Sequence, residues 1–339
     1  MPERSAKLYL RHRSGDHDLI LRRGCSASLR HFTDLSHRRV LVAAAAGLPA
    51  GMADALLGQC EQGVLCTLPG GARGRGLSGV ELVLAALAEN GFARGDLVVG
   101  LGGSSLLGVA GFAAAVYLGG VDFVSVPTST CAQLCACGGS MLGVNLEKPG
   151  FRAGVSRAPR LVLVDADLAD SQPEVGRRNG LAWAMQMALT VDPELFALLE
   201  AETLDMDEVL FRVLNDKKKL MDQYPDGEAP VLDFGGALAR ALWRLYGRSG
   251  RRTRGLGPGE CLFLAMTALT KDKALARDLR AVCRREGLSS RAAWNREKVL
   301  AALAEDPTWE NGTLPLITVP GLGCWEMNRP TAAELKEYL

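Results

Sequence analysis

A glycine-rich turn between an apolar strand and a helix is the first stretch that could do chemistry. Residues 97–99 read as a buried strand, Gly100, Gly102 and Gly103 follow, and an apolar helical pattern runs over 106–117. Glycines at such a turn let the backbone approach a phosphate, and the amino end of the helix faces that phosphate. The turn therefore predicts a nucleotide-type site, although many α/β proteins carry the same glycines for packing alone.

Cysteine and histidine are the other residue types that could support catalysis or bind a metal. Of the nine cysteines, Cys131, Cys135 and Cys137 lie close together, but their spacing matches no common zinc pattern. Small apolar packing residues are the favoured interpretation of this cluster, and a shifted zinc site is the alternative. All four histidines lie at or before His37, so the rest of the chain has no imidazole.

A longer series of motifs is more specific than the glycine turn. It comprises Gly102-Gly103, Ala110-Gly111-Phe112, Tyr117, Val126-Pro127-Thr128, Ala132-Gln133 and Gly143-Val144-Asn145. In this order and spacing the series resembles 3-dehydroquinate synthase and the related sugar-phosphate cyclases. Weaker resemblance recurs over 180–200, at Leu232-Asp233-Phe234-Gly235 and at Gly259-Glu260, so it covers nearly the whole chain.

The resemblance implies a metal site that this sequence does not reproduce. The family uses NAD to oxidise a hydroxyl of a phosphorylated seven-carbon sugar acid transiently, while a zinc ion held by one Glu and two His polarises the reacting oxygens. The corresponding positions here hold Trp183, Gly236 and Pro258, and none of these side chains can bind a metal. We therefore expect no zinc.

The positions through which the family recognises its substrate also differ. They hold Gln186, Arg240, Met141, Cys135 and Gly119, the last in place of an arginine that reaches the neighbouring subunit's phosphate site. Lys217, Lys218 and Lys219 lie near another family lysine. A dianionic substrate needs complementary positive charge, and most of it is missing from these positions.

The implied cofactor positions are partly kept. Gly102, Gly103, Thr128 and Ser129 match the family, whereas Ser104 replaces a third glycine. The aspartate that the family has in its glycine loop is Gly108 here. The acidic residue that follows the family's Pro-Gly-Gly is Ala72, and the lysine three residues later is Arg75. We expect NAD to bind weakly or not at all.

Alternating strands and helices must position these residues. We expect a short hairpin before residue 40, strands at 39–46, 63–68, 97–99, 123–126 and 161–164, and helices between them, one over 79–90 capped by Ser78 and Glu81. After Asp165 we expect helices, including one over 231–246, and one short strand at 314–319. The predicted fold is α/β: a Rossmann-like domain with a parallel, doubly wound sheet (residues 1–166), followed by an all-helical domain (167–339).

Composition narrows the function further. The chain has 339 residues and a net charge of +1, which argues against general affinity for nucleic acid or an anionic membrane. The uncharged run 97–121 is broken by glycines, which favours a protein core over a membrane span. Nine cysteines and no apolar leader indicate free thiols in a reducing, cytoplasmic compartment.

Relative to the family, this sequence keeps residues that shape the backbone and the packing, and it lacks the charged and metal-binding residues. We therefore expect a dehydroquinate synthase-like protein that has lost the cyclase reaction and acts by binding, as a homodimer or as a heterodimer with an intact synthase. One alternative is another reaction in a remodelled cleft, with Cys131, Cys135, Cys137, Lys217 and Glu260 as candidate groups. A working cyclase with a misaligned metal site is a third hypothesis, and the role of the basic segment 248–254 stays open.

Overall fold

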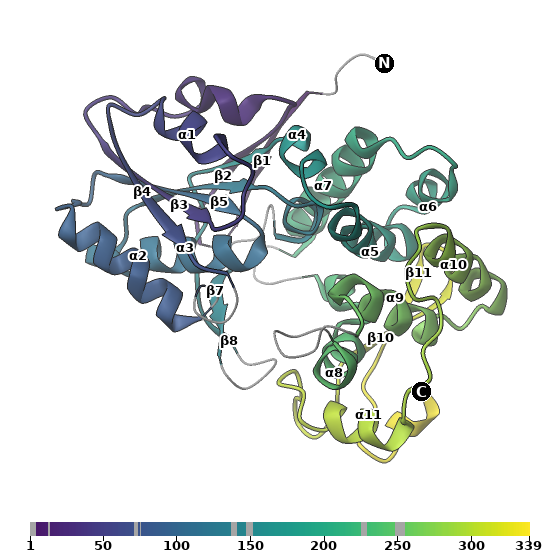
Figure 1. Cartoon of the computed structure of the whole chain (residues 1–339). Coiled ribbons are helices and arrows are strands. Elements are labelled where there is room, and N and C mark those ends of the chain that lie inside the picture. Colours follow the sequence, from purple (N-terminus) through teal and green to yellow (C-terminus); the bar gives the residue numbers. More distant parts are fainter. Residues whose placement is uncertain are drawn as a thin grey trace. The chain divides into compact units, whose positions relative to one another are not determined.

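The computed structural model describes residues 5–12, 14–70, 74, 76–136, 141–146, 152–224, 229–247 and 255–339. The chain forms two compact units, Met1–Arg177 with Met206–Gly227, and Arg178–Asp205 with Glu228–Leu339. The predicted domain boundary after residue 166 stays a prediction, because the first unit also takes in a helix from much later in the sequence. Figure 1 labels the elements of both units.

A seven-stranded sheet forms the centre of the first unit (Figure 1). Its strand order is β1-β2-β9-β6-β5-β3-β4, and only β1 runs antiparallel to its neighbour. The strands are β1 (Ala6–Leu10), β2 (His17–Leu21), β3 (Arg39–Ala45), β4 (Gln62–Leu68), β5 (Leu97–Gly102), β6 (Asp122–Pro127) and β9 (Leu161–Val164). The predicted hairpin before residue 40 and the parallel sheet are confirmed.

Helices cover both faces of this sheet, as expected for a doubly wound fold. Alternate residues of β3 face opposite cores: Leu41 packs with α2 and α3, and Val42 packs with η1 and α1. The covering elements are η1 (Cys25–His31), α1 (Met52–Leu57), α2 (Leu77–Glu89), α3 (Ser104–Val116), η3 (Tyr117–Gly119), η4 (Ala132–Ala136), α4 (Ala166–Asp170), α7 (Met206–Gln223) and the unpredicted hairpin of β7 (Met141–Asn145) and β8 (Arg152–Ser156).

Most of the second unit is helical. Its elements are most of α5 (Glu174–Thr190), then α6 (Pro193–Glu200), η5 (Pro230–Asp233), α8 (Gly236–Tyr246), α9 (Pro258–Leu269), α10 (Lys273–Arg285), α11 (Arg296–Leu303), β10 (Leu316–Gly321), β11 (Cys324–Asn328) and η6 (Leu335–Glu337). The expectation of an all-helical domain is wrong in one respect, because β10 and β11 form an antiparallel hairpin.

Two local predictions are wrong for identifiable reasons. Helix α2 begins at Leu77 after Gly76, which makes no side-chain capping bond, so Ser78 and Glu81 lie inside the helix rather than capping it. The predicted helix over 231–246 is interrupted, because Gly235 has φ of 78° and an α-helix begins only at Gly236. Among the helices of the described segments, none is long and apolar enough to cross a membrane.

Candidate functional site

The predicted cofactor residues come together at the carboxyl ends of β5 and β6. Gly102 ends β5, Gly103 precedes α3, and the Thr128 amide donates to the Gly102 carbonyl at 3.0 Å. Ser129 accepts the Ala132 amide at 3.2 Å and so fixes the turn after β6. In parallel α/β sheets ligands bind at this edge. The five predicted residues, including Ser104 at the start of α3, therefore share one site.

The surroundings of Gly102, Gly103 and Gly108 differ, and so do the reasons why each position is glycine. A Cβ on Gly102 would lie 3.1 Å from the Leu106 side chain, so a larger residue would crowd the turn. A Cβ on Gly103 would meet only the Ser129 hydroxyl, at 3.6 Å, which leaves room for close approach of a ligand. A Cβ on Gly108 would overlap the Gly143 carbonyl oxygen of β7. The aspartate that the resemblance implies at residue 108 does not fit this arrangement.

A buried carboxylate and a buried amide complete the carboxyl edge, and the sequence-based reasoning gave neither a role. The Asp165 carboxylate accepts the Gly24 amide at 2.9 Å, the Ser26 amide at 3.1 Å and the Ser26 hydroxyl at 2.6 Å. Gln133 donates its side-chain amide to the Asp165 carbonyl at 2.8 Å and to the Pro127 carbonyl at 3.2 Å. The signal for Asp165 was its place directly after the buried strand 161–164. Its bonds hold the turn before η1 against the end of β9.

The metal positions implied by the resemblance serve as parts of helices in the second unit. Trp183 lies within α5, Gly236 is the first residue of α8, and Pro258 is the first residue of α9. Proline suits this first position because its missing amide hydrogen has no partner there anyway. None of the three offers a lone pair to zinc, so these residues do not fit the family's metal. Across the described segments, no group of three or more His, Cys, Asp or Glu side chains could hold a metal ion.

Glu260 is the acidic group nearest in sequence to these positions, and it is used for capping. One oxygen accepts the Gly257 amide at 2.6 Å and the other accepts the Ser289 amide at 2.9 Å. Asn179 supports the same helix start, because its oxygen accepts the Gly259 amide at 3.0 Å. Glu260 therefore ties the start of α9 to the segment after α10.

Two of the predicted substrate positions are occupied by side chains with internal partners. Gln186 is buried, and its amide donates to the Phe234 carbonyl at 2.7 Å. Arg240 donates to Asp306 and to Asp233, each at 2.8 Å. Burial disfavours the charged guanidinium, but these hydrogen bonds outweigh it and raise the pKa of Arg240. Burial acts to raise the pKa of Asp306, yet the hydrogen bond from Arg240 leaves it below its ordinary value.

The remaining predicted residues join neither the group at the carboxyl ends of β5 and β6 nor the group around α8 and α9. Lys218 pairs with Asp222 at 2.6 Å and Lys219 with Asp216 at 2.8 Å, both within α7, the helix that also contains Lys217. Gly119 lies in a tight turn with φ of 79°. Cys131 approaches Ser104, with 3.8 Å between sulfur and oxygen. The side chains of Met141 and Cys135, residues Ala72, Arg75 and Cys137, and the segment 248–254 lie outside what the structure describes.

Sequence comparisons point to one family. The family model described as the 3-dehydroquinate synthase N-terminal region matches residues 65–178. A 3-dehydroquinate synthase from Streptococcus thermophilus is 27% identical over 290 residues, which is 79% of each chain. One from Streptococcus pneumoniae is 28% identical over the same share.

Comparisons of structure show the same fold. The 2-epi-5-epi-valiolone synthase of Streptomyces hygroscopicus, solved with NAD+ and Zn2+, matches with a TM-score of 0.81 at 22% identity over 95% of each chain. A 2-deoxy-scyllo-inosose synthase matches with a TM-score of 0.81 at 15% identity over 98% of each chain. The predicted α/β fold is therefore confirmed. The chain is therefore similar to 3-dehydroquinate synthases in sequence and to sugar-phosphate cyclases of this kind in fold.

Proposed function

We propose that this dehydroquinate synthase-like protein does not carry out the NAD- and zinc-dependent cyclisation and acts by binding. The observation that carries the proposal is the use made of the three implied ligand positions. Trp183, Gly236 and Pro258 build helices α5, α8 and α9 and offer no metal donor. Without a metal, the oxygens of a sugar-phosphate substrate lack the Lewis acid that this chemistry uses.

The polar side chains around those positions support the same proposal. Gln186 and Glu260 form hydrogen bonds with backbone groups, and Arg240 pairs with two aspartates. Breaking a hydrogen bond to a charged group costs about 1.5–3 kcal/mol, so these groups serve a substrate only at the expense of the fold. The runner-up hypothesis of another reaction that uses Glu260 loses support for the same reason.

We also propose that NAD binds weakly or not at all. The crowding between Gly108 and the Gly143 carbonyl leaves no space for an acidic side chain at residue 108. Ser104 adds a side chain at the first position of α3, where the resemblance implies glycine. The retained Gly103, Thr128 and Ser129 then serve to join β5, β6 and α3.

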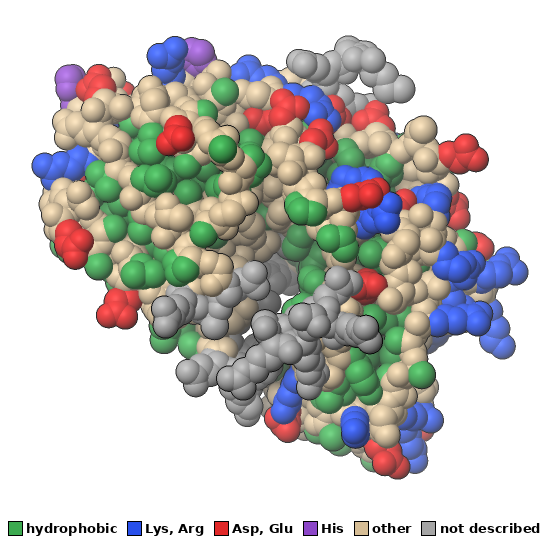
Figure 2. All heavy atoms as spheres, viewed as in Figure 1, with side chains coloured by type: hydrophobic (Ala, Val, Ile, Leu, Met, Phe, Trp, Pro, Cys, Tyr) green, Lys and Arg blue, Asp and Glu red, His purple; other side chains and the backbone are tan. Residues whose placement is uncertain are grey.

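The binding role requires a partner, and we propose a second copy of this chain or an intact synthase. The apolar helix α3 does not support this, because Val109, Ala110 and Ala113 are buried in the unit's own core. Support comes instead from the outer strand β4 and helix α2. There Leu65 is 43% exposed and Leu77 is 55% exposed, and Figure 2 shows hydrophobic side chains gathered over this part of the first unit.

The test of lost catalysis measures metal content and turnover on one preparation. The protein is incubated with zinc and NAD, freed of excess metal and assayed for phosphate release from the family's phosphorylated seven-carbon sugar acid. The Streptococcus thermophilus synthase is assayed in parallel as the positive control. We expect no stoichiometric zinc and no phosphate above the blank. One zinc per chain, or phosphate release that a chelator abolishes, contradicts the proposal.

The test of partnership is light scattering of the protein alone and after mixing with the intact synthase of its own source. We expect a dimer in one of the two samples. A monomer in both, with unchanged synthase kinetics, contradicts this part of the proposal. Leu65→Lys is the informative variant, because a charge on the outer strand disrupts strand-to-strand association.

A further inference from the structure

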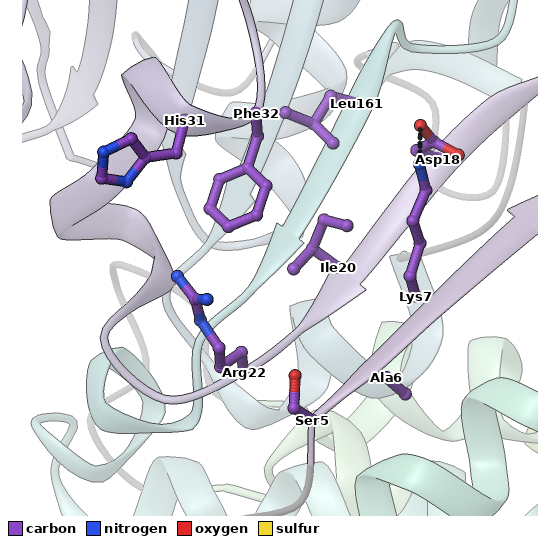
Figure 3. A pocket seen from close by; sticks show the side chains of 9 residues that line it. All are labelled: Ser5, Ala6, Lys7, Asp18, Ile20, Arg22, His31, Phe32 and Leu161. Atoms are coloured by element: carbon purple, nitrogen blue, oxygen red, sulfur yellow. Dashed lines mark ion pairs between the residues drawn. The ribbon is translucent and has the colours of Figure 1, made fainter.

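A pocket of about 290 Å³ lies over strand β2, next to the edge strand β1 of the sheet, and the functions considered so far do not use it. Figure 3 shows that it crosses strand β2, with Ile20 near its centre. Its lining residues share none of the predicted cofactor, substrate or metal positions. It belongs entirely to the first unit and is hereafter called the edge pocket.

The floor of the edge pocket is apolar. Ile20 is 7% exposed, and Leu161 of the neighbouring strand β9 is 3% exposed. The Phe32 ring stands beside them, directly after η1. Because alternate residues of a strand share a face, Asp18, Ile20 and Arg22 all line this one pocket. A flat apolar body can therefore lie across β2 between the two charged ends of the pocket.

The two charged ends differ in how they are neutralised. At one end, Lys7 pairs with Asp18 at 2.9 Å. At the other, the Arg22 guanidinium lies 5.1 Å from the centre of the Phe32 ring. Within the described part of the chain, no carboxylate or carbonyl oxygen accepts a hydrogen bond from that guanidinium. Arg22 thus carries the one uncompensated full charge among the described side chains lining the edge pocket.

The backbone holds Arg22 and Phe32 in place. The Arg22 amide donates to the Val164 carbonyl at 3.1 Å, and its carbonyl accepts the Cys25 amide at 3.3 Å. The Phe32 amide donates to the Leu29 carbonyl at 2.9 Å. A guanidinium fixed on an aromatic face offers a planar fork that matches a carboxylate. Preorganisation of this kind lowers the entropy cost of binding.

We propose that the edge pocket binds a small organic anion that consists of a carboxylate on a flat apolar body. The carboxylate faces Arg22, and the body lies on Ile20 and Leu161 beside Phe32. A cationic ligand is disfavoured because Lys7 already neutralises Asp18. A neutral ligand leaves the guanidinium without an acceptor. This site does not depend on the loss of the cyclase reaction.

Benzoate and its neutral analogue benzamide are the probes, used in calorimetric titrations of the full chain. We expect benzoate to bind with a dissociation constant of about 1 mM or tighter and benzamide to bind at least about tenfold more weakly. Absence of benzoate binding at about 10 mM, or equal binding of the two probes, overturns the proposal.

Variants assign the binding to the edge pocket. Arg22→Gln is expected to weaken benzoate binding about tenfold, and Arg22→Lys to weaken it less, because lysine keeps the charge but loses the planar fork. The matched control is Arg11→Gln, since Arg11 lies 5.8 Å from the Tyr9 ring centre and does not line the pocket. Circular dichroism checks the fold of each variant. Equal affinities of Arg22→Gln, Arg22→Lys and Arg11→Gln overturn the assignment.

Discussion

Two buried aspartates, one in each unit, are held in different ways. Asp165 follows β9 in the first unit and accepts hydrogen bonds from neutral donors, namely the amides of Gly24, Ser26 and Asp167 and the Ser26 hydroxyl. Asp306 in the second unit accepts the Arg240 guanidinium and the amide and hydroxyl of Thr308. The first unit thus satisfies its buried carboxylate with neutral donors. The second keeps charges but pairs them with each other.

This difference bears on function because both aspartates lie beside positions to which the resemblance gives a role. In the first unit, Asp165 is tied through Gln133 to the end of β6, next to the retained Thr128. In the second unit, Arg240 stands at a position where the resemblance implies an active-site histidine. Each arrangement satisfies its polar groups internally, so we expect removal of these groups to affect stability more than any ligand binding.

The largest expected effect is on the charged arrangement. Arg240→Met leaves the Asp306 carboxylate buried, with 4% of its side chain exposed and only Thr308 to donate to it. Breaking a buried ion pair from one side costs about 3–5 kcal/mol, and we expect about 4 kcal/mol here. Denaturant unfolding measures the change.

The control for this variant lies on the same helix. Arg244→Met removes a pair with Glu305 at 2.9 Å, whose side chains are 35% and 49% exposed. Such exposed pairs contribute about 0–1 kcal/mol. Equal losses in the two variants contradict a special role for Arg240.

Removal of Asp165, which has only uncharged donors, should lower the free energy of unfolding less than removal of Arg240. Asp165→Ala leaves the Gly24 and Ser26 amides without their acceptor, and we expect a loss of about 3 kcal/mol from the first unit. Because the groups that donate to the Asp165 carboxylate are amides and a hydroxyl and carry no full positive charge, added salt should change this loss little. The control is Asp170→Ala, which removes an ion pair of Arg23 whose aspartate is 50% exposed. A loss below about 1 kcal/mol in Asp165→Ala contradicts the assigned role.

Asp165 and Arg240 show which features of the structure could be predicted from the sequence and which could not. Strand periodicity located β3 to β6 and β9, and the glycine turn located the cofactor-type edge, because both depend on local pattern. Two partners of Asp165, Gly24 and Ser26, lie 141 and 139 residues away in the chain, and Asp306 lies 66 residues from Arg240. Single-sequence reasoning has no signal for such pairings.

The hairpin of β7 and β8 escaped prediction for a related reason. Its strands contain glycines and small residues and lie within an otherwise helical stretch of the expected βαβ pattern, so neither propensity nor alternation singled them out. Their partner is α3, where Gly108 and Gly111 leave room for the backbone of Gly143 and the side chain of Leu142. Only this tertiary contact explains why residue 108 is glycine.

The pH dependence of the free energy of unfolding should distinguish the two units, with an effect somewhat smaller than that of Asp165→Ala. Burial, with a lesser contribution from His12, lowers the pKa of His17 from 6.5 to about 4. The unfolded chain therefore takes up a proton that the folded first unit resists, and stability falls as pH drops from about 6.5 toward 4 and then levels off. We expect a loss of about 2–3 kcal/mol over this window.

Asp306 has the opposite charge and a different window. Its pKa is lowered in the folded state, so its contribution is complete above its ordinary pKa of 3.8 and is lost only below that pH. The first unit should therefore lose stability at a higher pH than the second. His17→Leu should abolish the upper phase, whereas replacement of the exposed His31 by Gln should not. An upper phase that survives His17→Leu contradicts the assignment.

The smallest expected effect is a shift near zero in the thermal unfolding transitions when NAD or zinc is added. This measurement is also the most direct test of whether each unit differs from that of an active synthase. NAD would bind the glycine edge of the first unit, and zinc would bind the implied ligand positions of the second. A ligand present at a thousandfold excess over its dissociation constant stabilises the folded state by about 4 kcal/mol, which a thermal melt detects easily. We expect neither NAD nor zinc to shift either unfolding transition. Stabilisation by NAD alone contradicts the cofactor half of the proposal and leaves the metal half intact, since Gly103, Thr128 and Ser129 are cofactor positions implied by the resemblance and none is an implied metal position. Stabilisation by zinc is the more damaging result, because Trp183, Gly236 and Pro258 cannot supply it, and a different set of ligands would have to exist.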